Sequence, residues 1–194
     1  MEESTCYKII HKARELFALQ GVANVTMSSI AKEAGVGRRT LYMYFSSKEH
    51  LYDSVVGYEV GIIYDAIKGV FDTSDLLPTV EVIRSYVHAR FDAFKELIQK
   101  NPSIRHDFIN DLPRVNHIRR EFNENELSLL KSLITRELGK ASCFCSVRVE
   151  SMSQLIHIML VGLEVPIIIQ NFSNETRGLL DQCIEMITKS IKIK

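Results

Sequence analysis

Apolar residues recur at intervals of three and four along almost the whole of this 194-residue chain. That spacing places them on one face of a helix, and no segment shows the alternation typical of a strand or hairpin. Capping residues and helix breakers separate the periodic segments. The sequence therefore predicts an all-α protein of about nine helices, near residues 5–20, 26–34, 38–45, 46–68, 79–100, 102–110, 114–139, 147–171 and 174–192.

The polar segment DTSDLLPT at 72–79 interrupts the pattern and is typical of a linker. It indicates a small N-terminal unit, residues 1–64, joined to a larger helical body, residues 65–194. The sequence SSKE at 46–49 predicts a capping box at the start of the fourth helix, with Ser46 as the cap and Glu49 reaching back.

The formal net charge is zero, so the whole chain shows no electrostatic preference for nucleic acid or membrane. Residues 8–48 differ, because seven Lys and Arg side chains stand against two acidic ones there. The N-terminus lacks the apolar core of a signal peptide, and the most apolar stretch, 155–170, is shorter than the roughly 20 residues of a spanning helix. We expect a cytoplasmic protein without a membrane partner, whose four cysteines are free thiols.

Residues 26–45 have the organisation of a helix-turn-helix: two short helices, a turn containing Gly35, and a basic second helix. Leu41 and Phe45 lie four residues apart and are expected to pack inward, with Val36, Ile30 and Phe17. The outer side and its margins then carry Arg38, Arg39, Thr40, Tyr42, Met43 and Tyr44.

These side chains suit DNA. Arginine binds guanine or phosphate, and the hydroxyls of threonine and tyrosine can bond to phosphate oxygens. Lys48 adds a cation at the start of the next helix, where backbone amides also favour an anion. A solvated basic face would explain the arginines alone, but the spacing, the hidden Leu/Phe pair and the local charge together favour DNA binding.

The segment 26–51, TMSSIAKEAGVGRRTLYMYFSSKEHL, resembles the DNA-binding region of TetR-type transcriptional regulators. The shared anchors are Thr26, Ile30-Ala31, Ala34-Gly35-Val36, Thr40-Leu41-Tyr42, Tyr44-Phe45 and Lys48-Glu49-His50-Leu51. The resemblance implies phosphate contacts from Thr26, Tyr44 and Lys48, base reading by Arg38, Arg39, Thr40 and Met43, and either role for Tyr42. Gly37 and Arg39 replace the serine and glycine common in the family, which affects the operator sequence rather than the binding mode.

The resemblance also implies that residues 65–194 sense a small-molecule effector and form a homodimer through the last two helices. The protein would then be a repressor released from operator DNA by that effector. On the helix near 147–171, one stripe holds Met152, Ile156, Met159, Leu160, Leu163 and Ile167, and a second holds His157, Val161, Glu164 and Ile168. A helix that is apolar on two sides is buried on two sides, one of them available for a partner subunit.

Polar residues on apolar stripes are candidates for an effector pocket. Arg90 shares a face with Phe94 and points inward, so it needs an anionic partner. That partner is either Glu164, which makes the pair structural, or a bound carboxylate or phosphate, unless the long side chain reaches water instead. His157 is a core histidine, a pH-sensitive group or a ligand contact, and Tyr86 and Phe94 are core residues or line a pocket.

Other functions leave weaker signals. Cys143 and Cys145 could begin a metal or redox site with Cys183 and His157, but no second ligand pair stands at a recognisable spacing. The sequence indicates no metal and no cofactor, and it contains no common motif of an enzyme active site. The main alternative to a DNA-binding regulator is a helical adaptor that binds another protein without effector control.

Overall fold

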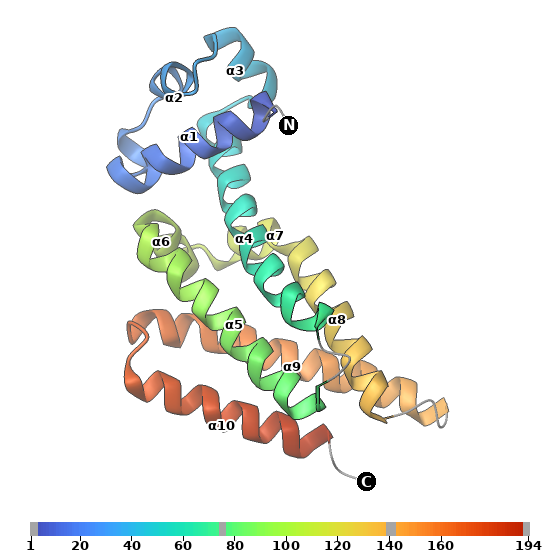
Figure 1. Ribbon diagram of the computed structural model, residues 1–194. Helices are drawn as coiled ribbons and strands as arrows, with labels where there is room; N and C mark the ends of the chain where they lie inside the picture. The colour runs from blue at the N-terminus through green and yellow to red at the C-terminus, as the bar shows by residue number, and fades with distance from the viewer. Residues whose placement is uncertain (1–3, 74–76, 139–142, 192–194) are drawn as a thin grey trace. The chain divides into compact units, whose positions relative to one another are not determined.

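The computed structural model describes residues 4–73, 77–138 and 143–191, with only the backbone for 143–145. This part of the chain forms α-helices and one short 3-10 helix and contains no strand, which confirms the all-α prediction (Figure 1). The elements are α1 (Thr5–Gln20), η1 (Val22–Asn24), α2 (Met27–Glu33), α3 (Arg38–Tyr44), α4 (Lys48–Asp72), α5 (Thr79–Lys100), α6 (Pro102–Asn110), α7 (Leu112–Ile118), α8 (Arg120–Leu138), α9 (Cys143–Ile169) and α10 (Asn174–Ile191).

Three boundaries differ from the prediction. The single helix expected over 114–139 is divided at Arg119 into α7 and α8, so the described chain has ten α-helices. Helix α9 begins at Cys143, four residues earlier than expected. Helix α4 is capped one residue later than predicted: the hydroxyl of Ser47 accepts a hydrogen bond from the His50 amide at 3.1 Å, while Ser46 contacts the His50 ring.

The chain folds into two compact units that interleave in sequence. The first contains residues 1–61 and 97–119, and the second contains 62–96 and 120–194. Helices α4 and α5 each contribute residues to both units. The functional boundary near residue 64 stays a prediction, whereas the segment 97–119 is physically a part of the first unit.

The core of the first unit forms around α1. Ile9, Ala13 and Phe17 are buried at helical spacing on its inner face. Leu41 of α3 is fully buried, and Phe45 and Ile30 are buried as well. The predicted cluster therefore exists, although Val36 is only half-buried. It fixes which side of α3 faces inward.

Local chemistry sets the turn between α2 and α3. Thr26 caps α2, because its hydroxyl accepts from the Ser29 amide while the Ser29 hydroxyl accepts from the Thr26 amide, both at 3.1 Å. At the other end Gly35 has φ +65°, a conformation that disfavours any residue with a Cβ. The Val36 amide then bonds to the Ala31 carbonyl at 2.9 Å, which closes the turn.

The second unit is built on α8, α9 and α10, with α10 running back along α9 (Figure 1). The inward face of α9 draws on both predicted stripes, with Ile156 and Leu160 from the first and Glu164 and Ile168 from the second. The opposite face carries Leu155 and Ile158, which are 66% and 64% exposed. The stripe analysis did not identify this uncovered apolar face.

Helix α9 is longer than the 16-residue apolar stretch singled out in the sequence. By length and composition Ser146–Ile169 could cross a membrane, with a mean hydropathy of 1.8. Core helices pass the same test, and here Ser153 and Glu164 of this segment are buried within the protein. The apolarity of α9 is accounted for by one face in the core and one face uncovered.

Candidate DNA-binding surface and sensor core

Helix α3 presents its polar side to solvent. Arg38, Arg39, Tyr42 and Tyr44 are exposed, and Met43 is 78% exposed. Thr40 is half-buried near the helix start. The two arginines form no hydrogen bond or ion pair with the described part of the chain. Their guanidinium groups are available to an external anion or base edge.

The other predicted DNA contacts flank this helix. Thr26 is exposed at the N-terminus of α2, although its hydroxyl also accepts the capping bond from Ser29. Lys48 lies at the first turn of α4 and is half-buried. Its ammonium donates to backbone carbonyls of the segment between α1 and α2, so this predicted phosphate contact has protein partners here. All eight predicted residues are brought to the helix-turn-helix and its edges.

Ionic and polar contacts that the sequence analysis missed hold the rest of the first unit together. Glu59 of α4 is 3% exposed and accepts from Arg14 of α1 at 2.6 Å and from Asn101 at 2.9 Å. Asp53 of α4 accepts from Arg114 of α7 at 2.8 Å. These pairs are 42 to 61 residues apart in sequence, so no local periodicity could have revealed them.

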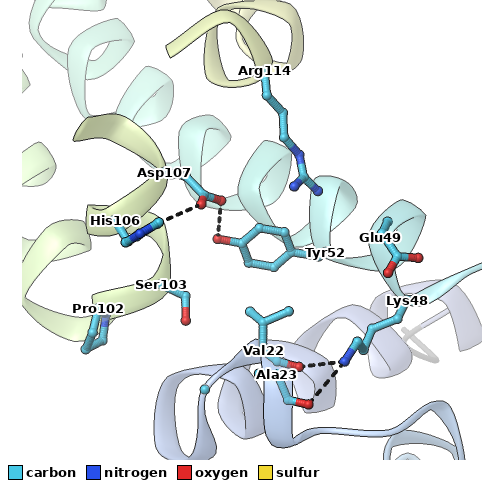
Figure 2. A pocket seen from close by; sticks show the side chains of 11 residues that line it. Val22, Ala23, Lys48, Glu49, Tyr52, Pro102, Ser103, His106, Asp107 and Arg114 are labelled. Carbon is cyan, nitrogen blue, oxygen red and sulfur yellow. Dashed lines mark hydrogen bonds and ion pairs between the residues drawn. The ribbon is translucent and has the colours of Figure 1, made fainter. Parts of the chain in front are cut away.

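A groove of about 630 Å³ lies beside these contacts, between the segment 21–23, the start of α4, α6 and α7. Figure 2 shows Tyr52 on one wall, with its hydroxyl donating to Asp107 at 2.8 Å. Burial, together with that bond, raises the pKa of Tyr52 far above its ordinary value, so the phenol stays a donor. The Arg114 guanidinium lies over the same ring.

The second unit encloses a buried charged cluster, which we call the sensor core: Tyr86, Arg90, Glu126, His157 and Glu164. Arg90 is 1% exposed and donates to Glu126 at 2.7 Å and Glu164 at 2.5 Å. Arg90 points inward, as predicted, and of the partners that the sequence left open it contacts Glu164. The sequence analysis missed Glu126, which is fully buried and also accepts from Tyr86 at 2.9 Å.

His157 completes the sensor core through its Nδ1, 3.0 Å from Glu126 Oε2. Burial alone would raise the pKa of Glu126, but Arg90 and the bond from His157 outweigh it and lower that pKa to about 2. Burial also raises the pKa of Tyr86 well above its ordinary value. With His157 neutral, the two glutamate carboxylates carry one more negative charge than the Arg90 guanidinium balances.

Two predicted features fall outside the sensor core. Phe94 is buried and packs edge-on against Phe172, with ring centroids 6.5 Å apart. The side chains of Cys143 and Cys145 lie outside the described residues, so their metal or redox role stays a hypothesis. Within the described residues, no group of three or more His, Cys, Asp or Glu side chains could hold a metal ion.

The geometry of α2, the Gly35 turn and α3 defines a helix-turn-helix motif, with the polar side of the second helix exposed to solvent. Comparisons with known proteins agree. Residues 9–55 match the family model for bacterial regulatory proteins of the tetR family. An uncharacterized HTH-type transcriptional regulator of Bacillus subtilis, YerO, is 32% identical over 89 residues, which cover 46% of this chain and 31% of that protein.

Solved structures of low identity share the whole fold. The fatty acid degradation regulator FadR of Bacillus halodurans has a TM-score of 0.63 at 18% identity, covering 100% of both chains. FadR of Bacillus subtilis in complex with stearoyl-CoA has a TM-score of 0.60 at 18% identity, covering 93% of this chain and 96% of that one. Residues 9–55 are thus a tetR-type DNA-binding region, as the resemblance of residues 26–51 implied, and this chain matches less than a third of the length of the regulator YerO.

The acid stability of the second unit depends on Glu126. Its carboxyl has an ordinary pKa of 4.5 and a folded pKa of about 2. The lowered pKa therefore adds about 3 kcal/mol to the free energy of unfolding. This contribution is complete above about pH 4.5 and is lost as the pH falls toward 2. We expect Glu126→Gln to lack this acid-dependent part of the unfolding free energy.

Urea unfolding between about pH 5 and pH 3 measures the difference. Glu124→Gln, which changes an exposed glutamate of the same helix, should follow the wild type. If the unfolding free energies of the Glu126 variant and the wild type fall equally with pH, the Glu126 carboxyl is not the source of the acid-dependent stability.

Proposed function

We propose that this regulator is a homodimeric repressor that binds a two-fold symmetric operator and is released by a small-molecule effector. The observation that carries the proposal is the exposed side of α3. Two arginines, two tyrosines and a methionine face solvent there, while Leu41 and Phe45 hold the helix from behind. A regulator of this family needs such a helix to enter the major groove.

The individual roles follow from side-chain chemistry. Arg38 and Arg39 carry planar donor groups that match the O6 and N7 acceptors of guanine. Met43 is an exposed apolar side chain, suited to the methyl group of thymine. Thr40 and Tyr42 supply hydroxyls to bases or phosphates, and Thr26 and Tyr44 bind phosphates at the edges.

The homodimer accounts for the uncovered apolar face of the second unit. Leu155 and Ile158 of α9 and Met186 of α10 are each more than 60% exposed. Between the two helices lies an apolar groove of about 200 Å³, which Met152, Met159 and Met186 help to line. Gly162 continues the face, and a Cβ there would meet no atom of the chain within 4 Å. A second copy packed on this face would remove these side chains from water.

The effector is proposed to act on the second unit, where the sensor core couples α5, α8 and α9. A ligand that favours one arrangement of these helices shifts the population of the DNA-binding form. The structure of Bacillus subtilis FadR with stearoyl-CoA shows that a regulator of this fold accepts a small molecule. We place the protein in the cytoplasm, without enzymatic activity. The helical adaptor is the alternative, with the same apolar face binding a different protein.

Selection of bound duplexes from a random pool tests the DNA-binding proposal. We expect an enriched palindrome with half-sites about one helical turn apart or overlapping, because each subunit of a two-fold dimer presents one α3. Arg38→Met and Arg39→Met should relax the sequence preference at guanine positions. Failure of the folded protein to enrich any sequence would favour the adaptor.

Release by a small molecule is tested on the selected operator. We expect at least one compound of a metabolite and drug panel that includes stearoyl-CoA to weaken operator binding by about tenfold or more, since coupling of 1–3 kcal/mol is common. By linkage, operator DNA must weaken binding of the same compound by the same factor. Operator affinity that no bound compound alters would contradict effector control.

The dimer is tested by placing a charge on its proposed face. Ile158→Glu should shift sedimentation equilibrium toward monomer and weaken operator binding, because a buried unpaired carboxylate disfavours the interface. Ser132→Glu changes an exposed residue of α8 and serves as the control. If the Ile158→Glu variant remains as dimeric as the wild type, the dimer interface does not include this face.

A further inference from the structure

The ammonium group of Lys48 has a complete set of hydrogen-bond partners within the first unit. It donates to the carbonyl oxygens of Val22 at 2.8 Å, Val25 at 3.1 Å and Ala23 at 3.4 Å. A lysine ammonium has three N–H donors, so each has one carbonyl. Figure 2 shows the side chain turned from α4 toward the backbone of residues 22 and 23.

The acceptors belong to the connection that sets the position of α2. Val22 and Ala23 lie in η1, and Val25 is the residue after it. Thr26 follows at once as the cap of α2. The bonds to Val22 and Val25 are partly buried, where an unpaired carbonyl would be costly, and the bond to Ala23 is exposed. One cation therefore satisfies three backbone groups directly before the capping residue.

Lys48 is also the first residue of α4, which comes directly after α3 and its connection. Its side chain thus connects the start of α4 to the segment directly before α2. Helix α3 lies between these two points along the chain. Because α3 is only seven residues long, its own hydrogen bonds do little to fix its direction. The burial of Leu41 and Phe45 sets which side of α3 faces inward, and the contacts at either end of the helix-turn-helix help to set the direction of its axis.

A phosphate contact would require Lys48 to give up some of these bonds. All three donors are occupied and the positive charge already faces carbonyl dipoles, whereas Arg38 and Arg39 have no such partners in the described chain. We propose that Lys48 is a positioning residue, which holds the α1–α2 connection so that Thr26 and α3 meet DNA in register, and does not itself bind phosphate. This inference rests on the proposed operator binding.

The slope of operator affinity against salt concentration separates the two roles. A cation that neutralises a phosphate contributes about 0.9 to the slope of log affinity against log salt. We expect Lys48→Met, which keeps the alkyl chain and removes the charge, to weaken operator binding roughly tenfold through lost preorganisation. Its salt slope should equal that of the wild type. Arg39→Met, which removes a side chain assigned to a base edge, serves as the control for a lost direct DNA contact and should weaken binding chiefly to sequences with guanine at its position.

Hydrogen exchange reports the positioning directly. The Asn24 amide donates to Gly21 and the Thr26 amide donates to Ser29, both within the connection that Lys48 holds. Both amides should exchange faster in Lys48→Met than in the wild type. Lys32→Met, an exposed lysine in the last turn of α2, should leave their exchange unchanged. If Lys48→Met does not fold, Lys48→Gln retains a donor without charge, and the same slope comparison applies.

Weaker binding with an unchanged slope and faster exchange supports the proposal. A slope lower by about 0.9 would assign Lys48 to a phosphate and overturn it. Faster exchange with unaltered operator affinity would also overturn it, because the bonds would then be structural without guiding DNA contact. If the wild type binds no DNA, operator binding itself fails, and the exchange data still show whether Lys48 orders the connection.

Discussion

The burial of Leu41 and Phe45 is the interaction on which the recognition surface depends. A seven-residue helix is marginal in water, so α3 exists because one of its sides is covered by the core that includes Phe17 and Ile30. The same burial decides the direction of every other side chain on the helix. With Leu41 inside, Arg38, Arg39 and Met43 must lie in solvent, and the DNA-facing chemistry follows from an apolar contact.

The two units are held together internally in different ways. In the first, charged contacts at the edges, such as Arg14 with Glu59 and Arg114 with Asp53, join elements distant in sequence around an apolar core. In the second, the charge is at the centre, where Arg90 lies between Glu126 and Glu164. Replacing a buried pair of this kind by apolar residues often costs little stability, whereas an arrangement that separates its members leaves an uncompensated buried charge. A centre of this type suits a domain that must have a small number of defined states.

The sequence predicted features that depend on residues close together along the chain, but it did not reveal contacts between residues that are far apart. Helix periodicity and the inward direction of Leu41 and Arg90 depend on neighbours within a few turns, and the structure confirms them. Glu126 and Glu59 were missed because their partners lie 31 to 45 residues away along the chain. The partners of Lys48 were missed for a further reason. They are backbone carbonyls, which every residue has, so the residue types do not indicate which carbonyls accept a hydrogen bond.

The discontinuity of the first unit has a consequence for biosynthesis. Glu59, Asp53 and Tyr52 emerge from the ribosome well before Asn101, Arg114 and Asp107, with which they pair. Until residue 119 has been made, the nascent N-terminal helices lack these partners, and Glu59 holds only Arg14. The first unit is thus completed after half of the chain has been translated, and a fragment cut at residue 64 would keep α1, α2, α3 and their apolar core without the contacts from Asn101, Asp107 and Arg114.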